Sequence, residues 1–122
     1  MNKTILIIED EQLLLNLLTM KFKKFGFDVE SAIDANEACS LLQKKEVHFI
    51  LLDILLPGID GYAILKKLKN DKKLKHIPVI VVSNLGGVDE KDKAKNLGAL
   101  DFIIKAEHSP TDIAERVRKI LG

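Results

Sequence analysis

Five strand-like segments, most of them apolar runs, alternate with five stretches of helical periodicity, and this order constrains the fold more than any other feature of the chain. The runs are strand-sized, and the stretches between them repeat apolar residues at helical spacing. Strict alternation of this kind predicts a parallel sheet with right-handed crossovers and helices on both faces. Five strands favour an open, doubly wound, flavodoxin-like sheet, because a closed barrel needs about eight. The expected strands are 3–8, 27–32, 49–52, 79–82 and 101–104, and the expected helices are 11–25, 34–44, 62–68, 89–97 and 110–120.

Residues at the predicted boundaries support this assignment. Asp10 is expected to cap the first helix and Gly26 to end it. Asp34 followed by Glu37 resembles a capping box, and residues 109–110 (Ser-Pro) supply an N-cap and a first-turn proline. The fourth helix has few apolar residues, so it is expected to be the least firmly anchored.

Length and composition narrow the class of protein. With 122 residues and 47% hydrophobic residues, the chain is expected to be one domain, 1–122, with a single continuous core. A net charge of +1 argues against direct binding of nucleic acid, and no apolar run is long enough to span a membrane. The single cysteine, Cys39, excludes an internal disulfide and is interpreted as a small core or boundary residue. The expected location is cytoplasmic. The lysine-rich segment 66–75 is interpreted as a solvated helix face.

Polar side chains follow four of the five predicted strands. Glu9 and Asp10 come after the first strand, Asp53 after the third, Ser83 ends the fourth, and Lys105 follows the fifth. The carboxyl ends of parallel strands meet at one edge of the sheet, where ligands bind. Three carboxylates there would repel one another unless a cation lay among them, and a site of this kind suits Mg²⁺. The hydroxyl and the ammonium group suit the oxygens of a phosphoryl group.

Together these positions resemble the receiver domain of the response regulators of two-component signalling. The resemblance covers essentially the whole chain. Besides the residues at the strand ends, it includes Pro57, Asp60 and Gly61 after Asp53, and Phe102 on the last strand.

The resemblance implies a phosphoacceptor that takes a phosphoryl group on Asp53 from a phosphohistidine of a sensor kinase or a phosphotransfer protein. It implies that Ser83 and Lys105 bind the phosphoryl oxygens and that Phe102 is the aromatic residue of the switch. It also implies a downstream protein target, contacted through the fourth helix, the last strand and the fifth helix. The implied Mg²⁺ (or Mn²⁺) ligands are Asp10, Asp53, the backbone carbonyl of Leu55 and, through water, Glu9.

Two residues depart from the family pattern. Ala106 follows Lys105 where the family usually has proline, so we expect a trans peptide bond and a lysine held differently or more loosely. Asn84 replaces the small residue common after Ser83, and it is expected to narrow access to Asp53.

Two other functions remain open at this point. A pseudo-receiver would keep the fold as a phosphorylation-independent interaction domain, although the intact set of acids argues against it. An enzyme with an aspartyl-phosphate intermediate commonly has a second acid two residues after the nucleophile, and Leu55 stands there. The chain is therefore expected to catalyse only its own phosphorylation and dephosphorylation. It is expected to be a monomer, with phosphorylation-dependent dimerisation as a hypothesis.

Overall fold

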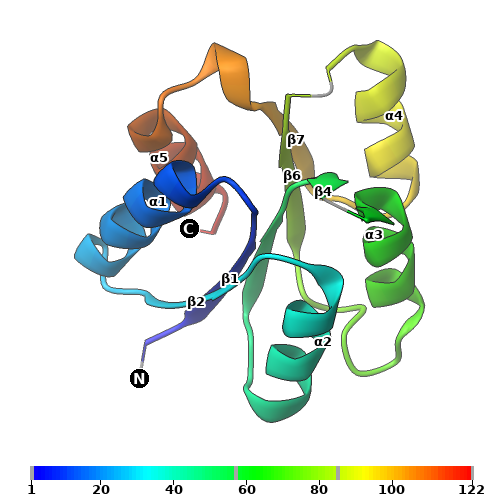
Figure 1. The fold of residues 1–122 in the computed structure, drawn as a ribbon, viewed down its shortest axis with the longest axis horizontal. Helices are drawn as coiled ribbons and strands as arrows, with labels where there is room; N and C mark the ends of the chain where they lie inside the picture. Colours follow the sequence, from blue (N-terminus) through cyan, green and yellow to red (C-terminus); the bar gives the residue numbers. More distant parts are fainter. Residues whose placement is uncertain (1, 57, 85, 122) are drawn as a thin grey trace.

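The computed structural model describes residues 2–56, 58–84 and 86–121, and Figure 1 shows their arrangement. Pro57, part of the predicted turn, lies outside them. The strands are β1 (Thr4–Ile8), β2 (Asp28–Ala32), β3 (Phe49–Leu52), β4 (Leu55–Leu56), β5 (Ile59–Asp60), β6 (Val79–Ser83) and β7 (Asp101–Ile104). The helices are α1 (Gln12–Lys24), α2 (Ala35–Lys44), α3 (Gly61–Asn70), α4 (Val88–Asn96), the 3₁₀ turn η1 (Lys105–Glu107) and α5 (Pro110–Leu121).

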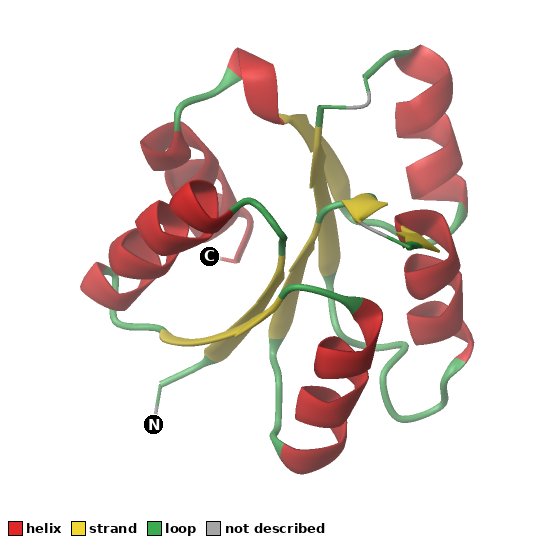
Figure 2. Ribbon diagram, viewed as in Figure 1, coloured by secondary structure: helices red, strands yellow, loops and turns green. Residues whose placement is uncertain are grey.

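One parallel sheet in the order β2-β1-β3-β6-β7 forms the middle of the molecule. β3 is the central strand, with Ile50 opposite Leu6 of β1 and Val79 of β6. Figure 2 shows α1 and α5 on one side of this sheet and α2, α3 and α4 on the other. The predicted five-stranded doubly wound fold with five α-helices is confirmed.

Alternate residues of the central strands belong to two separate hydrophobic cores. Ile5 and Leu51 face α1 and α5, whereas Leu6 and Leu52 face α2, α3 and α4. A strand buried on both faces needs an uninterrupted apolar sequence, because the side-chain direction reverses at every residue. This requirement explains why the central strands β1, β3 and β6 lack the polar alternation that edge strand β2 shows.

Most of the predicted helix boundaries are confirmed by their hydrogen bonds. The Glu37 N–H donates to Asp34 Oδ1 at 2.9 Å, and the Asp112 N–H donates to Ser109 Oγ at 3.0 Å. Gly26 has a φ of +95° and ends α1, with the N–H of Phe27 bonded back to the carbonyl of Phe22.

The prediction that Asp10 caps α1 is wrong. The helix begins at Gln12, and its N-cap is Glu11, whose side chain makes no capping bond. The carboxylate of Asp10 instead lies beside those of Glu9 and Asp53.

Two short elements were not predicted, and both adjoin the strand ends. β4 and β5 form an antiparallel hairpin with strands of two residues, and the hairpin begins two residues after Asp53. The η1 turn begins at Lys105, directly after β7. Within the part of the chain that the structure describes, no helix has both the length and the apolar character needed to cross a bilayer.

Candidate functional site

The backbone brings Glu9 and Asp53 together at the carboxyl edge of the sheet. Each follows a central strand, and each continues the sheet by one hydrogen bond. The Asp53 N–H donates to the Ile8 carbonyl at 3.0 Å, and the Glu9 N–H donates to the Ala32 carbonyl at 2.9 Å. Only 4% of Asp53 and 2% of Glu9 are exposed, although both have ionisable side chains. Charged side chains are rarely buried to this degree unless they are paired.

Both carboxylate oxygens of Asp53 are engaged. Oδ1 accepts a hydrogen bond from the Leu55 N–H at 2.9 Å, and Oδ2 lies 2.7 Å from Lys105 Nζ. The first contact closes a tight turn just after β3, and the second reaches across from the end of β7. Because both contacts are short and shielded in part from solvent, they fix the orientation of the Asp53 carboxylate.

Lys105 is paired with two buried carboxylates. Its Nζ lies 2.6 Å from Glu9 Oε1 as well as 2.7 Å from Asp53 Oδ2, and 3.7 Å from Glu11 Oε2. Burial by itself would lower the pKa of Lys105, but the hydrogen bonds with Asp53 and Glu9 raise it above its ordinary value. The peptide bond to Ala106 is trans, as predicted, because the described residues contain no cis bond. Lys105 is held by these contacts without a following proline, and the expectation that it is held differently or more loosely than in the family stays a prediction.

Burial raises the pKa of Glu9 from 4.5 to about 7, and the negative charge of Asp53 adds to this increase. The hydrogen bonds from Lys105 and from the Glu11 N–H act in the opposite direction. A carboxylate in this position is costly near neutral pH, so additional positive charge in the site would stabilise it.

The three acids fit a divalent cation. Glu9, Asp10 and Asp53 each offer an oxygen, and these oxygens lie within 4.8 Å of one another. Asp10 is exposed, so the group is open to solvent on one side. Three carboxylates and one ammonium group leave a formal charge of −2 when all four are ionised, which a hard divalent ion neutralises.

The other predicted site residues lie around this group. Ser83 is fully buried at the end of β6, next to β3, while Asn84 is exposed beyond it. Phe102 is 5% exposed and packs into the core under α4, so its ring is inward in this structure. The Leu55 side chain is half exposed, and its N–H is already bonded to Asp53.

Sequence patterns gave no sign of a contact between α3 and α4. The Tyr62 hydroxyl donates to the Glu90 carboxylate, and Lys93 Nζ lies 4.2 Å from the centre of the Tyr62 ring. Tyr62 is 7% exposed, and burial together with the hydrogen bond to Glu90 raises its pKa well above the usual value of a phenol. These contacts tie the N-terminal half of α4, which has few apolar residues, to α3.

Removing the Tyr62 hydroxyl is expected to loosen α4. Tyr62→Phe keeps the ring in the core and deletes one hydrogen bond to a charged group, so the free energy of unfolding should fall by about 1–2 kcal/mol. Amide hydrogen exchange should accelerate in α4 and stay unchanged in α5. Lys93→Met is the matched variant, because it removes the cation–π contact and leaves the hydrogen bond. Unchanged exchange in α4 of Tyr62→Phe would show that the contact does not hold the helix.

Comparisons with known proteins agree with this fold. The family model of the response regulator receiver domain matches residues 5–118. The probable transcriptional regulator ycf27 of Porphyridium aerugineum is 32% identical over 117 residues, which are 96% of this chain and 47% of that protein. The chain spans about half the length of this and similar curated relatives.

Solved structures show the same architecture. A response regulator of Chloroflexus aurantiacus superimposes with a TM-score of 0.88 at 28% identity, covering 99% of this chain and 98% of the other. The structure of response regulator Rcp1 superimposes with a TM-score of 0.82 at 26% identity, covering 97% and 91%. A parallel α/β sheet with three acids and a lysine at its carboxyl edge defines a phosphoacceptor module of two-component signalling. The chain belongs to the response regulator receiver domain family.

Proposed function

We propose that Asp53 is the phosphoacceptor of this receiver domain and that Lys105, Ser83 and the metal-binding acids serve its phosphorylation. The observation that carries the proposal is the buried Asp53 carboxylate at the end of the central strand, in contact with Lys105 and within 4.8 Å of two other acids. The phosphodonor is a phosphohistidine of a sensor kinase or of a phosphotransfer protein.

In the transfer, an oxygen of Asp53 forms a bond to phosphorus while the bond between phosphorus and the histidine nitrogen breaks. The imidazole keeps the electron pair and is reprotonated from solvent. Such a reaction needs charge neutralisation and alignment more than a general base. Lys105 neutralises developing charge on the phosphoryl oxygens, and the Ser83 hydroxyl donates a hydrogen bond to one of them.

The proposed metal is Mg²⁺, held by Asp10, Asp53 and the Leu55 carbonyl, with Glu9 acting through water. When bound, it would neutralise negative charge on the phosphoryl group and bring it in line with Asp53. Two facts support a divalent cation: the all-oxygen donor set described above, and the Mn²⁺-bound form in which the related Rcp1 was solved.

The output is a shift in α4, β7 and α5. The phosphoryl group adds negative charge, and Ser83 and Lys105 move toward it. Phe102 on β7 then changes its orientation as the switch residue. Because α4 contributes only Ala94 as a buried residue, a small free energy can shift it between arrangements. Asn84, which is exposed and directly follows Ser83, is proposed to narrow access to Asp53 and so to slow both phosphorylation and hydrolysis.

The kinase contact is proposed for α1. Its exposed face presents Leu13, Leu17 and Met20 at helical spacing, with exposed fractions of 69%, 40% and 68%. This stripe begins four residues after Glu9, close to the site that the phosphodonor must reach. The downstream partner is a protein, and the chain itself makes no contact with nucleic acid. We propose a monomer that forms dimers when phosphorylated and that catalyses no reaction other than its own phosphorylation and dephosphorylation.

Incubation with acetyl phosphate and Mg²⁺, followed by intact-mass measurement, tests the proposal. The wild-type chain should gain the mass of one base-labile phosphoryl group, as expected for an acyl phosphate. Asp53→Asn should gain none and should have an unchanged circular dichroism spectrum, and omission of Mg²⁺ should abolish the adduct. A folded wild-type chain that gains no phosphoryl group would exclude a phosphoacceptor and favour the pseudo-receiver.

A further inference from the structure

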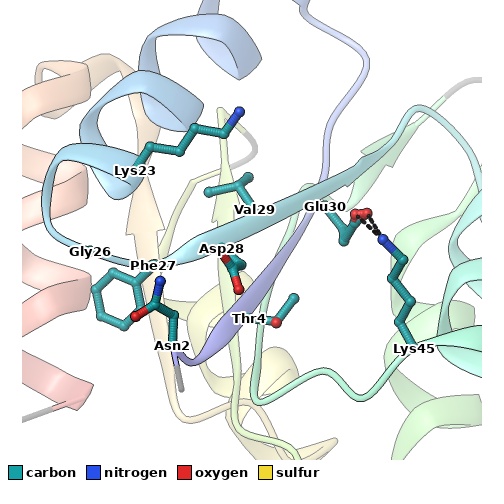
Figure 3. Close-up of a pocket in the computed structure, with 9 residues that line it drawn as sticks. All are labelled: Asn2, Thr4, Lys23, Gly26, Phe27, Asp28, Val29, Glu30 and Lys45. Atoms are coloured by element: carbon teal, nitrogen blue, oxygen red, sulfur yellow. Dashed lines mark hydrogen bonds and ion pairs between the residues drawn. The ribbon is translucent and has the colours of Figure 1, made fainter.

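Two hollows of about 530 Å³ lie on the described surface away from the acids. The first lies beside edge strand β2 and is shown in Figure 3, where Glu30 and Lys45 point toward each other along its rim. Its lining includes both acidic and basic side chains. Two of these, Glu30 and Lys45, form an ion pair with each other at 2.8 Å. Nothing in this hollow selects a ligand.

The second hollow is a groove between α2 and α3, and its floor is apolar. Ile8 of β1 lies at the bottom, with Ala38 and Leu42 on the α2 side and Ile64 and Leu68 on the α3 side. All but Leu42 are buried, so the groove ends on the hydrophobic core. Ligand pockets in proteins commonly have volumes of about 300–1,000 Å³ and mainly apolar walls.

Small side chains keep this groove open. Ala35 and Cys39 on α2 and Ala63 on α3 line it where larger residues would bring the helices into contact. On the opposite face of the sheet, the larger Phe22 of α1 belongs to the same core as Ile113 and Val117 of α5. The groove is therefore a property of the sequence on these two helices.

The rim of the groove is positively charged. Lys67 and Lys73 line it, and within the described ranges neither ammonium group has an acidic partner at ion-pair distance. The one acid of the lining, Asp71, accepts hydrogen bonds from the backbone N–H groups of Lys73 and Leu74 through Oδ1. Lys66 and Lys72 add further positive charge on either side along the chain.

From this combination we infer that the groove between α2 and α3 binds a small amphipathic carboxylate. An acyl chain of medium length fills the apolar floor, and its carboxylate lies between Lys67 and Lys73. The apolar floor contributes affinity by removing the chain from water, and the lysines select an acid over a neutral molecule of the same shape. None of the three acids lines this groove, although its floor residue Ile8 directly precedes Glu9, and the groove gives part of the lysine-rich segment a function beyond solvation.

Cys39 provides a direct measurement, because it is the only cysteine of the chain and it lines the groove. The rate of its alkylation by the uncharged reagent N-ethylmaleimide is measured with increasing decanoate, below the concentration at which decanoate forms micelles. Decanoate should slow the reaction of the wild-type chain at saturation, and decanol should protect with at least fivefold lower affinity.

The double variant Lys67→Gln/Lys73→Gln should bind decanoate about fivefold to tenfold more weakly, as the loss of two exposed ion pairs predicts. Lys23→Gln, in the hollow of Figure 3, is the matched control and should bind like the wild type. Ala63→Phe, at an exposed position of the rim, should fill the groove and abolish protection. No protection of wild-type Cys39 by decanoate, or equal protection in all variants and by decanol, would overturn the inference.

Discussion

Replacing Gly61 by alanine is expected to lower the free energy of unfolding by about 3 kcal/mol or more. A domain of this size has a total stability of about 5–15 kcal/mol, so the variant should be partly unfolded at moderate temperature. Chemical denaturation of the wild type and of Gly61→Ala, monitored by circular dichroism, measures the difference.

The expected loss comes from a backbone contact rather than from backbone conformation. A β-carbon on Gly61 would overlap the Ile54 Cα and would lie 2.8 Å from the Ile54 carbonyl carbon and oxygen. The Gly61 N–H also donates to that carbonyl at 3.0 Å, so the two segments cannot separate without losing this bond. Backbone cannot rotate away as a flexible side chain can, and Ile54 directly follows Asp53, the proposed phosphoacceptor. The variant should therefore also disturb the turn that orients Asp53.

Gly26→Ala is the matched control. Gly26 has a φ of +95°, and a β-carbon there would meet no atom within 4 Å. Its substitution should cost only the strain of the left-handed conformation, about 1–2 kcal/mol. If Gly61→Ala were no less stable than Gly26→Ala, the close approach to Ile54 would not be a constraint on this fold.

The fold and most of the site could be predicted from local patterns. Each central strand is recognisable as an apolar run, and the first polar residues at the end of that run lie at the edge of the sheet. Parallel topology then brings Glu9, Asp53 and Lys105 together although 96 residues separate the first from the last along the chain. The proximity of these three residues follows from the parallel topology alone and requires no sequence pattern that links them to one another.

What could not be predicted depends on distances between elements. The close approach of Gly61 to the Ile54 backbone depends on the hairpin of β4 and β5. The two strands of this hairpin have two residues each, which is too short for a recognisable sequence pattern. The bond from Tyr62 to Glu90 joins two helices, and Tyr62 looked like an ordinary apolar position of α3. The cap of α1 was misassigned because Asp10 and Glu11 are adjacent acids, and only the structure shows that Asp10 joins the acidic group instead.

Replacing Lys105 by methionine is expected to destabilise the metal-free protein by about 3 kcal/mol at pH 8. Methionine keeps most of the length of the side chain and removes the charge. The carboxylates of Glu9 and Asp53, which are 2% and 4% exposed, would then face each other without a counter-charge. Breaking a buried pair is costly because the remaining charges cannot be hydrated.

Two conditions should reverse this loss. Lower pH should reduce it, because Glu9 already has a pKa of about 7 with Lys105 present, and loss of the positive charge raises that pKa further. The wild type and the variant should therefore approach each other in stability as the pH falls from 8 toward 6. Millimolar Mg²⁺ should also restore stability, because a divalent cation supplies the charge that the ammonium group provided.

Lys45→Met is the control, since Lys45 forms an ion pair of similar length with Glu30, at 2.8 Å, but is 55% exposed. Its loss should cost less than about 1 kcal/mol and should respond neither to Mg²⁺ nor to pH in this range. Denaturation midpoints of the wild type, Lys105→Met and Lys45→Met, measured in EDTA and in Mg²⁺, give these stability differences. Equal stability of the two variants in EDTA would show that Lys105 is not the internal counter-ion of the site. A deficit confined to Lys105→Met and removed by Mg²⁺ would show that the lysine and the metal neutralise the same buried charge.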